Sequence, residues 1–301
     1  MLFAQPSSPT AIIIVGPTAS GKTSLSLKVA QHFDSSIISA DSRQCYREMN
    51  IGVAKPLPSE LSLLPHYFIN TNSILDTVDA IVFEKEALAA AKNIFLKNNT
   101  AIVTGGTGLY VKIFCEGIDD IPQTDPVVKQ QVNAVWEESG LAGIQRWLNE
   151  VDPDFLAFSN EPGNRARMMR ALEVKLSSGK SLLEFREGIK KTRPFKIRKI
   201  GIRWAREVLY QRINQRVDEM MNAGLLEEAA GLFPFRHLKA LQTVGYQELF
   251  DHFDEKYSLD EAIEKIKQHT RNFAKRQMTW FTKDKEIIWA EYNQLMEEII
   301  D

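Results

Sequence analysis

Apolar residues along the chain follow two patterns, which predict short buried strands separated by amphipathic helices. Ala11–Val15, Ser36–Ala40 and Ala101–Thr104 are short runs centred on apolar, mostly β-branched residues, as is typical of buried parallel strands. Thr23–Ala30 follows the first run with helical character, and Asp79–Lys97 places its apolar residues on one helical face. This alternation predicts an α/β fold built on a parallel sheet.

The strand–helix alternation stops between about Cys115 and Pro194. Three helices are predicted in this interval: Asp125–Ser139, Ala142–Glu150 and Arg165–Ser178, the last ended by Gly179. We therefore predict a P-loop NTPase-like parallel-sheet core with an inserted helical domain. The core would comprise residues 1–115 and 195–301, and the insertion residues 116–194.

The alternating apolar and basic residues of Lys196–Trp204 predict that the core resumes with a further strand. Beyond it, helices are predicted over Arg206–Ala223, Gln242–Asp251 and Ser258–Phe281. In the last of these we expect the apolar residues to pack inward, namely Phe273, Met278, Trp280 and Phe281. A shorter extended segment is expected at His66–Ile69.

Composition places the chain among ordinary globular proteins. Of 301 residues, 44% are hydrophobic and 25% charged, and no apolar run is long enough to span a membrane. The two cysteines, Cys45 and Cys115, are far apart and lack neighbouring histidines, which argues against a disulfide framework or a zinc finger. With no leader pattern at the N-terminus, a cytoplasmic enzyme is expected.

The charges are unevenly distributed despite a net charge of −2. Residues 186–216 contain eleven lysines and arginines against two acidic residues, Glu187 and Glu207. We expect this segment to form a strongly positive face.

A glycine-rich turn follows the first strand and has the pattern GxxxxGK[ST], here Gly16–Thr23. Gly16 and Gly21 allow a tight bend that directs backbone N–H groups toward an anion at the positive end of the next helix. Lys22 would add a positive charge, and Thr23 a hydroxyl for a phosphate-bound Mg²⁺. The pattern predicts a phosphate-binding loop.

Two further strand ends are expected at the same edge of the sheet. Asp41 follows the second predicted strand, and the glycine-rich stretch Gly105–Tyr110 follows a later one. Because the carboxyl ends of parallel strands share one crevice, both should lie near the phosphate site. Asp41 could bind Mg²⁺ through water or act as a general base, and the residues alone leave both roles open.

Two sets of arginines also have alternative readings. Arg212 and Arg216 share a helical face and could clamp a leaving diphosphate, or pair with Asp218 or Glu219. A third predicted helix of the insertion carries Arg165, Arg167 and Arg170, which could contact a phosphate backbone or form a solvated surface.

Several motifs that occur together along the chain indicate a more specific function than any one of them does alone. They are GPTASGKT (Gly16–Thr23), ADSRQCY (Ala40–Tyr46), IGVAKP (Ile51–Pro56), GGTGLY (Gly105–Tyr110), Asn164 with RMMRALE (Arg167–Glu173), VGY (Val244–Tyr246) with Glu248, and Thr270–Arg271 with AKRQ (Ala274–Gln277) and Trp280–Phe281. This set, spread over about residues 11 to 290, resembles the tRNA dimethylallyltransferases, also called tRNA isopentenyltransferases.

The resemblance implies transfer of a dimethylallyl group from dimethylallyl diphosphate to N6 of the adenosine immediately 3′ of the anticodon, in tRNAs reading codons that begin with U. Asp41, Thr23 and Arg216 would be the catalytic residues, with Asp41 accepting the N6 proton. Mg²⁺ would bind at Thr23, with Asp41 reaching it through water. The phosphate loop would hold the diphosphate through Gly16, Pro17, Thr18, Ala19, Ser20, Gly21, Lys22 and Thr23.

The resemblance also implies how tRNA is held by an enzyme that we expect to be a monomer. The target base must leave the anticodon-loop stack, which makes this a base-flipping reaction. Asp41, Ser42, Arg43, Gln44 and Thr107 would handle the extruded adenosine. Further tRNA contacts are implied for Lys129, Asn164, Arg165, Arg167, Arg170, Gln242, Gly245, Tyr246 and Gln247.

Other functions would use the same phosphate loop. A small-molecule kinase would transfer phosphate from ATP without RNA, with Asp41 as base toward a hydroxyl. A nucleotide-dependent RNA-binding module would keep its activity when Asp41 is replaced by alanine. An adenylate isopentenyltransferase would perform the same reaction on a free nucleotide, but the basic insertion favours a macromolecular acceptor.

Overall fold

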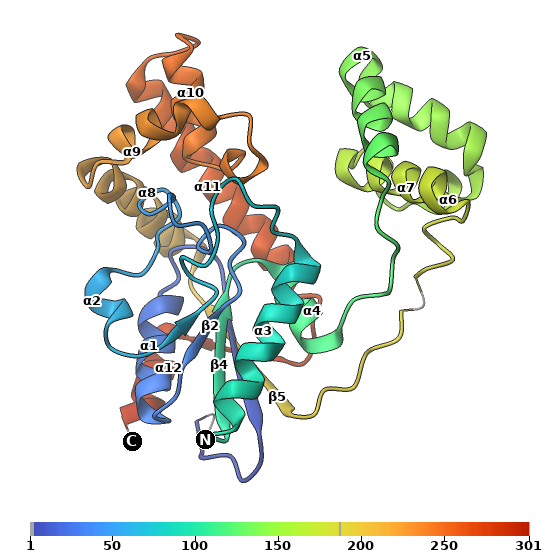
Figure 1. Ribbon diagram of the computed structural model, residues 1–301. Helices are drawn as coiled ribbons and strands as arrows, with labels where there is room; N and C mark the ends of the chain where they lie inside the picture. The colour runs from blue at the N-terminus through green and yellow to red at the C-terminus, as the bar shows by residue number, and fades with distance from the viewer. Residues whose placement is uncertain (1–2, 187, 301) are drawn as a thin grey trace. The chain divides into compact units, whose positions relative to one another are not determined.

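The computed structural model describes residues 3–186 and 188–300 (Figure 1). The chain divides into two compact units. The core unit comprises Met1–Glu116 and Thr192–Asp301, and the helical unit comprises Gly117–Lys191.

The core unit is built on a six-stranded sheet in the order β3-β2-β4-β1-β5-β6, in which every pairing is parallel. In chain order the strands are β1 (Thr10–Val15), β2 (Ile37–Ser39), β3 (His66–Tyr67), β4 (Thr100–Gly105), β5 (Lys196–Arg203) and β6 (Ile287–Glu291). The predicted parallel α/β fold is confirmed.

Alternating side chains of the central strand β1 divide the core into two layers. Ile12 and Ile14 pack with α1 (Lys22–His32) and α12 (Tyr292–Ile300) on one face of the sheet. Ile13 faces the opposite layer, where it packs among helices from the rest of the core unit. Every residue of β1 is buried, as expected for a strand covered on both faces.

The remaining core helices are α2 (Pro58–Leu61), α3 (Ala80–Phe95), α4 (Gly108–Glu116), α8 (Arg206–Asn222), α9 (Leu225–Leu232), α10 (Tyr246–Phe253) and α11 (Leu259–Phe281), with short 3₁₀ helices at Phe233–Phe235 and Lys239–Leu241. Among them, α8 to α11 lie together to one side of this sheet in Figure 1. Asp79 caps α3 by accepting the N–H groups of Ile81 and Val82.

The helical unit contains α5 (Pro126–Val151), α6 (Pro153–Phe158) and α7 (Arg165–Ser178) around a hydrophobic core of its own. Gly140 interrupts α5 with φ 58° and ψ −152°, so the two helices predicted on either side of it are separated by a real break. The predicted bounds of α7 are confirmed, with Gly179 as its left-handed C-cap.

Several expectations for the C-terminal part were wrong. Strand β6 and helices α9 and α12 were not predicted, and α10 begins at Tyr246 rather than at Gln242. In α11, Phe273 and Trp280 are 39% and 43% exposed, so they do not pack inward. The buried face of that helix is made instead by Ala262, Ile266, Ala274, Gln277 and Phe281.

The basic segment 186–216 does not form one positive face. Lys199 is buried in β5, where its amine contacts Asp284 at 2.7 Å and Glu286 at 2.8 Å. The side chain of Arg193 is 8% exposed and pairs with Glu84 at 2.6 Å. These two cations therefore pair with acidic residues of the core unit. Glu187, one of the two acidic residues counted in this segment, lies outside the described residues.

Both cysteines, Cys45 and Cys115, are buried and free. Among the helices of residues 3–186 and 188–300, none is both long enough and apolar enough to cross a membrane.

Candidate active site

A cavity of about 580 Å³ opens at the carboxyl ends of β1, β2 and β4, a size suited to a small-molecule ligand. Its walls include the phosphate loop (Gly16–Thr23) from Thr18 onward, the turn Asp41–Gln44 after β2, the loop Gly52–Leu57, the strand end Thr104–Thr107, and residues of α8 and α11. All of these belong to the core unit. The predicted meeting of three strand ends at one crevice is thus observed.

The phosphate loop leads directly into the N-terminus of α1. Its last glycine, Gly21, caps the helix at φ +90°, and a Cβ added there would lie 2.6 Å from the Tyr292 ring. Conformation and packing therefore both require glycine at this position. The Lys22 amine folds back and donates to the carbonyls of Gly16 at 3.0 Å and Pro17 at 2.7 Å. The loop is thus preformed around a cation at a helix N-terminus, an arrangement that favours anions.

Two arginines of α8 reach the same loop. Arg212 donates through Nε to the Ala19 carbonyl at 2.8 Å, and Arg216 approaches the Thr18 hydroxyl at 3.5 Å. The ion-pair alternative for these arginines is not realised, because Asp218 pairs with Lys267 and Glu219 accepts from Gln215. In the described part of the chain, no carboxylate lies within ion-pair distance of Lys22, Arg212 or Arg216.

Burial, together with the neighbouring positive charges, lowers the pKa of two of these groups. Enclosure of the amine lowers the pKa of Lys22 to about 7, with a further contribution from Arg216 and an opposing one from Asp41. Burial and the neighbouring Arg212 also lower the pKa of Arg216. A bound anion would relieve both effects, since it favours the charged forms.

The turn after β2 brings the predicted adenosine-binding residues together. Asp41 lines the cavity and accepts the N–H of Arg43 at 2.9 Å, while Thr107 accepts the N–H of Ser42 at 3.0 Å. Arg43 also lines the cavity. The Gln44 amide is engaged within the protein: it donates to the Val53 and Ala54 carbonyls and accepts from Ser39. Gln44 therefore connects the Asp41 turn to the opposite wall of the cavity.

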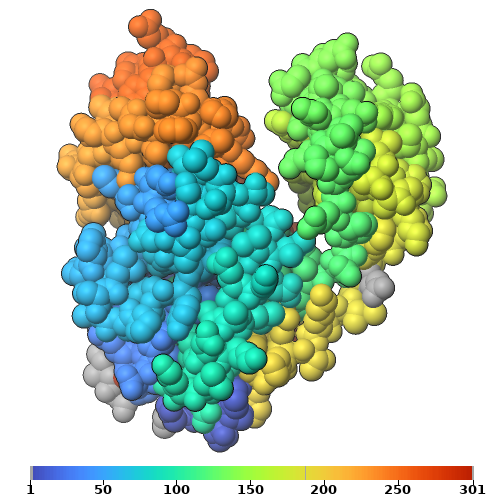
Figure 2. Space-filling model, viewed as in Figure 1, coloured from blue at the N-terminus to red at the C-terminus, as the bar shows by residue number. Residues whose placement is uncertain are grey.

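A single carboxylate binds the backbone at the start of that opposite wall. Glu228 of α9 accepts the N–H groups of Asn50, Ile51 and Gly52 at 2.9–3.0 Å, and the hydroxyl of Tyr246 at 2.6 Å. In Figure 2, the blue surface of this early part of the chain adjoins the orange surface of the C-terminal helices.

Tyr246 is fully buried, and its ring occupies the space that a Cβ at Gly52 would need. The Tyr246 hydroxyl supports the cavity wall through Glu228, and the implied contact of this position with tRNA stays a prediction. Its neighbours Gln242 and Gln247 are exposed, and Gly245 lines the cavity while its N–H donates to Glu248. These three positions remain candidates for substrate contact.

The candidate tRNA-binding residues of the helical unit differ in the number of contacts that their side chains make within that unit. Lys129 is exposed, whereas Asn164 caps α7 by accepting the N–H of Arg167 at 3.2 Å. The guanidinium of Arg165 lies 4.0 Å from the centre of the Trp136 ring. Arg167 is 3.5 Å from Glu161, an exposed pair that is weak in solution.

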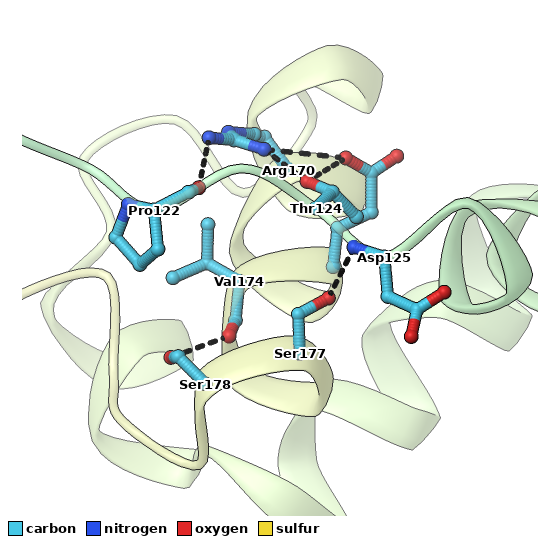
Figure 3. A network of polar contacts seen from close by, with 8 residues as sticks. Pro122, Thr124, Asp125, Arg170, Val174, Ser177 and Ser178 are labelled. Carbon is cyan, nitrogen blue, oxygen red and sulfur yellow. Dashed lines mark hydrogen bonds and ion pairs between the residues drawn. The ribbon is translucent and has the colours of Figure 1, made fainter.

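Arg170 is the most firmly held of these residues (Figure 3). Its guanidinium donates to the Thr124 hydroxyl and to the Pro122 carbonyl at 3.1 Å, and lies 3.8 Å from Glu173. These contacts fasten the segment before α5 onto α7. Arg170 thus has a structural role within the helical unit.

Gln277 lines the cavity but was not identified from the sequence as a site residue. Gln277 of α11 accepts the N–H of Thr18 at 2.8 Å and donates to the Gly106 carbonyl at 2.9 Å. Two signals could have found it: its place in the AKRQ motif (Ala274–Gln277), and its helical spacing from Ala274 and Phe281, which share its buried face.

A family model described as IPP transferase matches residues 44–284 of this chain. The chain is 47% identical over 290 residues to a tRNA dimethylallyltransferase of Christiangramia forsetii, covering 96% of each protein. It is 44% identical over 288 residues to tRNA dimethylallyltransferase 1 of Phocaeicola vulgatus, again covering 96% of each. The chain belongs to the IPP transferase family.

Solved structures agree with this family membership. The full-length tRNA isopentenylpyrophosphate transferase of Bacillus halodurans matches 97% of this chain and 95% of its own, with a TM-score of 0.70 and 32% identity. A eukaryotic dimethylallyltransferase acting on tRNA matches 95% of this chain and 75% of its own, with a TM-score of 0.78 and 26% identity. The predicted family resemblance is confirmed, and the family covers both units.

Proposed function

We propose that this protein transfers a dimethylallyl group from dimethylallyl diphosphate to N6 of the adenosine immediately 3′ of the anticodon, in tRNAs that read codons beginning with U. The tRNA dimethylallyltransferases that share 43–47% of its residues support this activity over the kinase and free-adenylate readings. The single observation that carries the donor assignment is the meeting of Lys22, Arg212 and Arg216 at the phosphate loop.

The chemistry of the diphosphate leaving group explains why positive charge would be concentrated at the phosphate loop. When the allylic C1–O bond breaks, negative charge develops on the diphosphate, and preformed donors stabilise it in the transition state. The N–H groups at the start of α1 and the Lys22 amine would contact the departing phosphates. Arg216 would add charge from the other side of the loop, since it already approaches Thr18.

Asp41 supplies the complementary chemistry. The N6 amine of adenine attacks C1 and forms the new N–C bond, which leaves a proton to be removed from nitrogen. Asp41 is placed on the cavity wall, and its Oδ1 is oriented by the Arg43 N–H at 2.9 Å. It would accept that proton, while the diphosphate carries away the bonding electrons. Atoms and charge therefore balance without a further reactant.

Mg²⁺ is proposed as the cofactor. The described residues contain no cluster of three or more His, Cys, Asp or Glu side chains arranged to hold a metal. Mg²⁺ commonly takes one or two protein oxygens together with substrate phosphates and water, and the Thr23 hydroxyl and Asp41 carboxylate line the same cavity. When bound there with the diphosphate, it would neutralise leaving-group charge.

Recognition of tRNA follows from the same placement. The target adenine must be extruded to reach the cavity, where Ser42, Arg43 and Thr107 would contact it. Cations of the helical unit, the exposed Lys129 and the partly exposed Arg167 among them, would bind the anticodon stem-loop through its phosphates. We further propose that the enzyme acts as a monomer in the cytoplasm.

The test compares three possible substrates in separate reactions. Purified protein is incubated with Mg²⁺, labelled dimethylallyl diphosphate and either unmodified tRNA, AMP or ATP. Label in tRNA alone is expected. Label in AMP would move the acceptor to a free nucleotide, and ATP consumption without transfer would indicate a kinase.

A further inference from the structure

Gln277 makes hydrogen bonds in two directions from a buried position. Its side chain is 6% exposed, its Oε1 accepts the Thr18 N–H at 2.8 Å, and its Nε2 donates to the Gly106 carbonyl at 2.9 Å. One partner is a donor and the other an acceptor, so both bonds fix the orientation of the amide.

The two partners belong to opposite sides of the reaction. Thr18 is part of the phosphate loop that would hold the leaving group. Gly106 precedes Thr107, whose hydroxyl accepts the N–H of Ser42 at 3.0 Å beside Asp41. Through this chain of contacts, Gln277 joins the diphosphate-binding loop to the segment that carries the proposed base.

The packing leaves little room for another arrangement. A Cβ added at Gly106 would overlap the Gln277 amide nitrogen, and would lie 4.0 Å from the Lys22 amine. Glutamate at 277 could accept from Thr18 but not donate to Gly106, and its charge would compete with the diphosphate for Lys22. Methionine has a similar length, but its thioether has no hydrogen-bond donor and is only a weak acceptor.

We propose that Gln277 is a positioning residue that fixes the diphosphate loop relative to the Asp41 segment. The inference rests on the proposed transfer reaction, because it assigns the leaving group to one segment and the proton acceptor to the other. Transfer requires the attacking nitrogen, C1 and the leaving oxygen to be aligned closely, so a small relative shift of the two segments slows the chemistry. Each substrate would keep its own contacts.

The test compares Gln277→Met with Gln268→Met, a control at an exposed glutamine of the same helix. Three quantities are measured below the unfolding temperature of every variant: the affinity for inorganic diphosphate with Mg²⁺, the affinity for tRNA, and the single-turnover rate of dimethylallyl transfer. For Gln277→Met we expect both affinities within about threefold of wild type and a rate lower by on the order of 10²-fold. Gln268→Met should match wild type in all three.

Each other outcome overturns a defined part of the inference. If Gln277→Met transfers at the wild-type rate, even with a lowered unfolding temperature, Gln277 is only structural. If its diphosphate affinity falls by the same factor as its rate, it is a binding residue rather than a positioning one. If the wild type itself labels no tRNA, the proposed function fails, whereas an active wild type isolates failure of the Gln277 inference.

Discussion

Binding of diphosphate should draw a proton onto Lys22. Enclosure by the loop and the nearby Arg216 lower the pKa of this amine to about 7. Against its ordinary value of 10.5, this shift corresponds to on the order of 5 kcal/mol that disfavours the charged form. Diphosphate reverses this effect, since its oxygens stabilise the ammonium form.

The sign of the pH dependence follows from the two states. Above pH 7 the empty site holds a mostly neutral lysine, whereas the bound site holds an ammonium, so binding must take up a proton. The affinity should therefore fall by up to tenfold for each pH unit above 7. In the same window the unfolded chain binds more protons than the empty folded protein, so the stability of the empty protein should rise with pH.

Isothermal titration calorimetry measures this uptake directly. At pH 8.5, titrations with diphosphate and Mg²⁺ in two buffers of different ionisation enthalpy should give nearly one proton per site for the wild type. Lys22→Arg is the matched control, because its guanidinium stays charged and should take up almost none. Equal proton uptake by the two proteins would refute the reasoning.

Three further perturbations separate chemistry, RNA binding and stability. Asp41→Ala should lower the transfer rate by about 10²- to 10⁴-fold in single-turnover assays while tRNA affinity stays within a few-fold; an equal loss of both would make Asp41 a binding residue. Lys129→Ala should weaken tRNA binding and reduce the slope of log K against log salt by about 1 in filter binding, whereas an unchanged slope would remove Lys129 from the RNA interface. Lys199→Met should lower the free energy of unfolding in urea by about 1–3 kcal/mol, because it leaves Asp284 and Glu286 without their shared buried partner, and a neutral effect would contradict that role.

The sequence predicted those parts of the fold that depend on local pattern. The β-branched run of β1, the glycines of the phosphate loop, and Gly179 at the end of α7 all act over a few residues, and their elements were found where expected. Strand β6 was missed because only Ile287 and its few apolar neighbours mark it, and its main support is pairing with β5.

The errors within α11 have a different cause. Phe273 and Trp280 are large and apolar, which suggested burial, but the helix turns each of them about 100° from its buried neighbours, Ala274 and Phe281. The helical period, rather than the size of the apolar side chains, determines which residues of α11 are buried. One of these buried residues is polar, Gln277.

Contacts between distant segments could not be derived from the chain alone. Glu228 and Gly52 are separated by 176 positions, and no local pattern links an acidic residue of one helix to the backbone of an early loop. The same holds for Gln277 and Thr18, which are 259 positions apart. The phosphate loop and Asp41 could be placed together because both follow parallel strands, whereas these supports depend on the folded packing of the C-terminal helices.

The most direct test of the account is to locate the modified nucleoside. Unmodified tRNA that reads a U-initial codon is treated with the protein, Mg²⁺ and dimethylallyl diphosphate, then digested and analysed by mass spectrometry, beside the same tRNA with guanosine 3′ of its anticodon. The account predicts N6-dimethylallyladenosine at that position in the first tRNA and no product in the second. Equal modification of both tRNAs, or of neither, would contradict it.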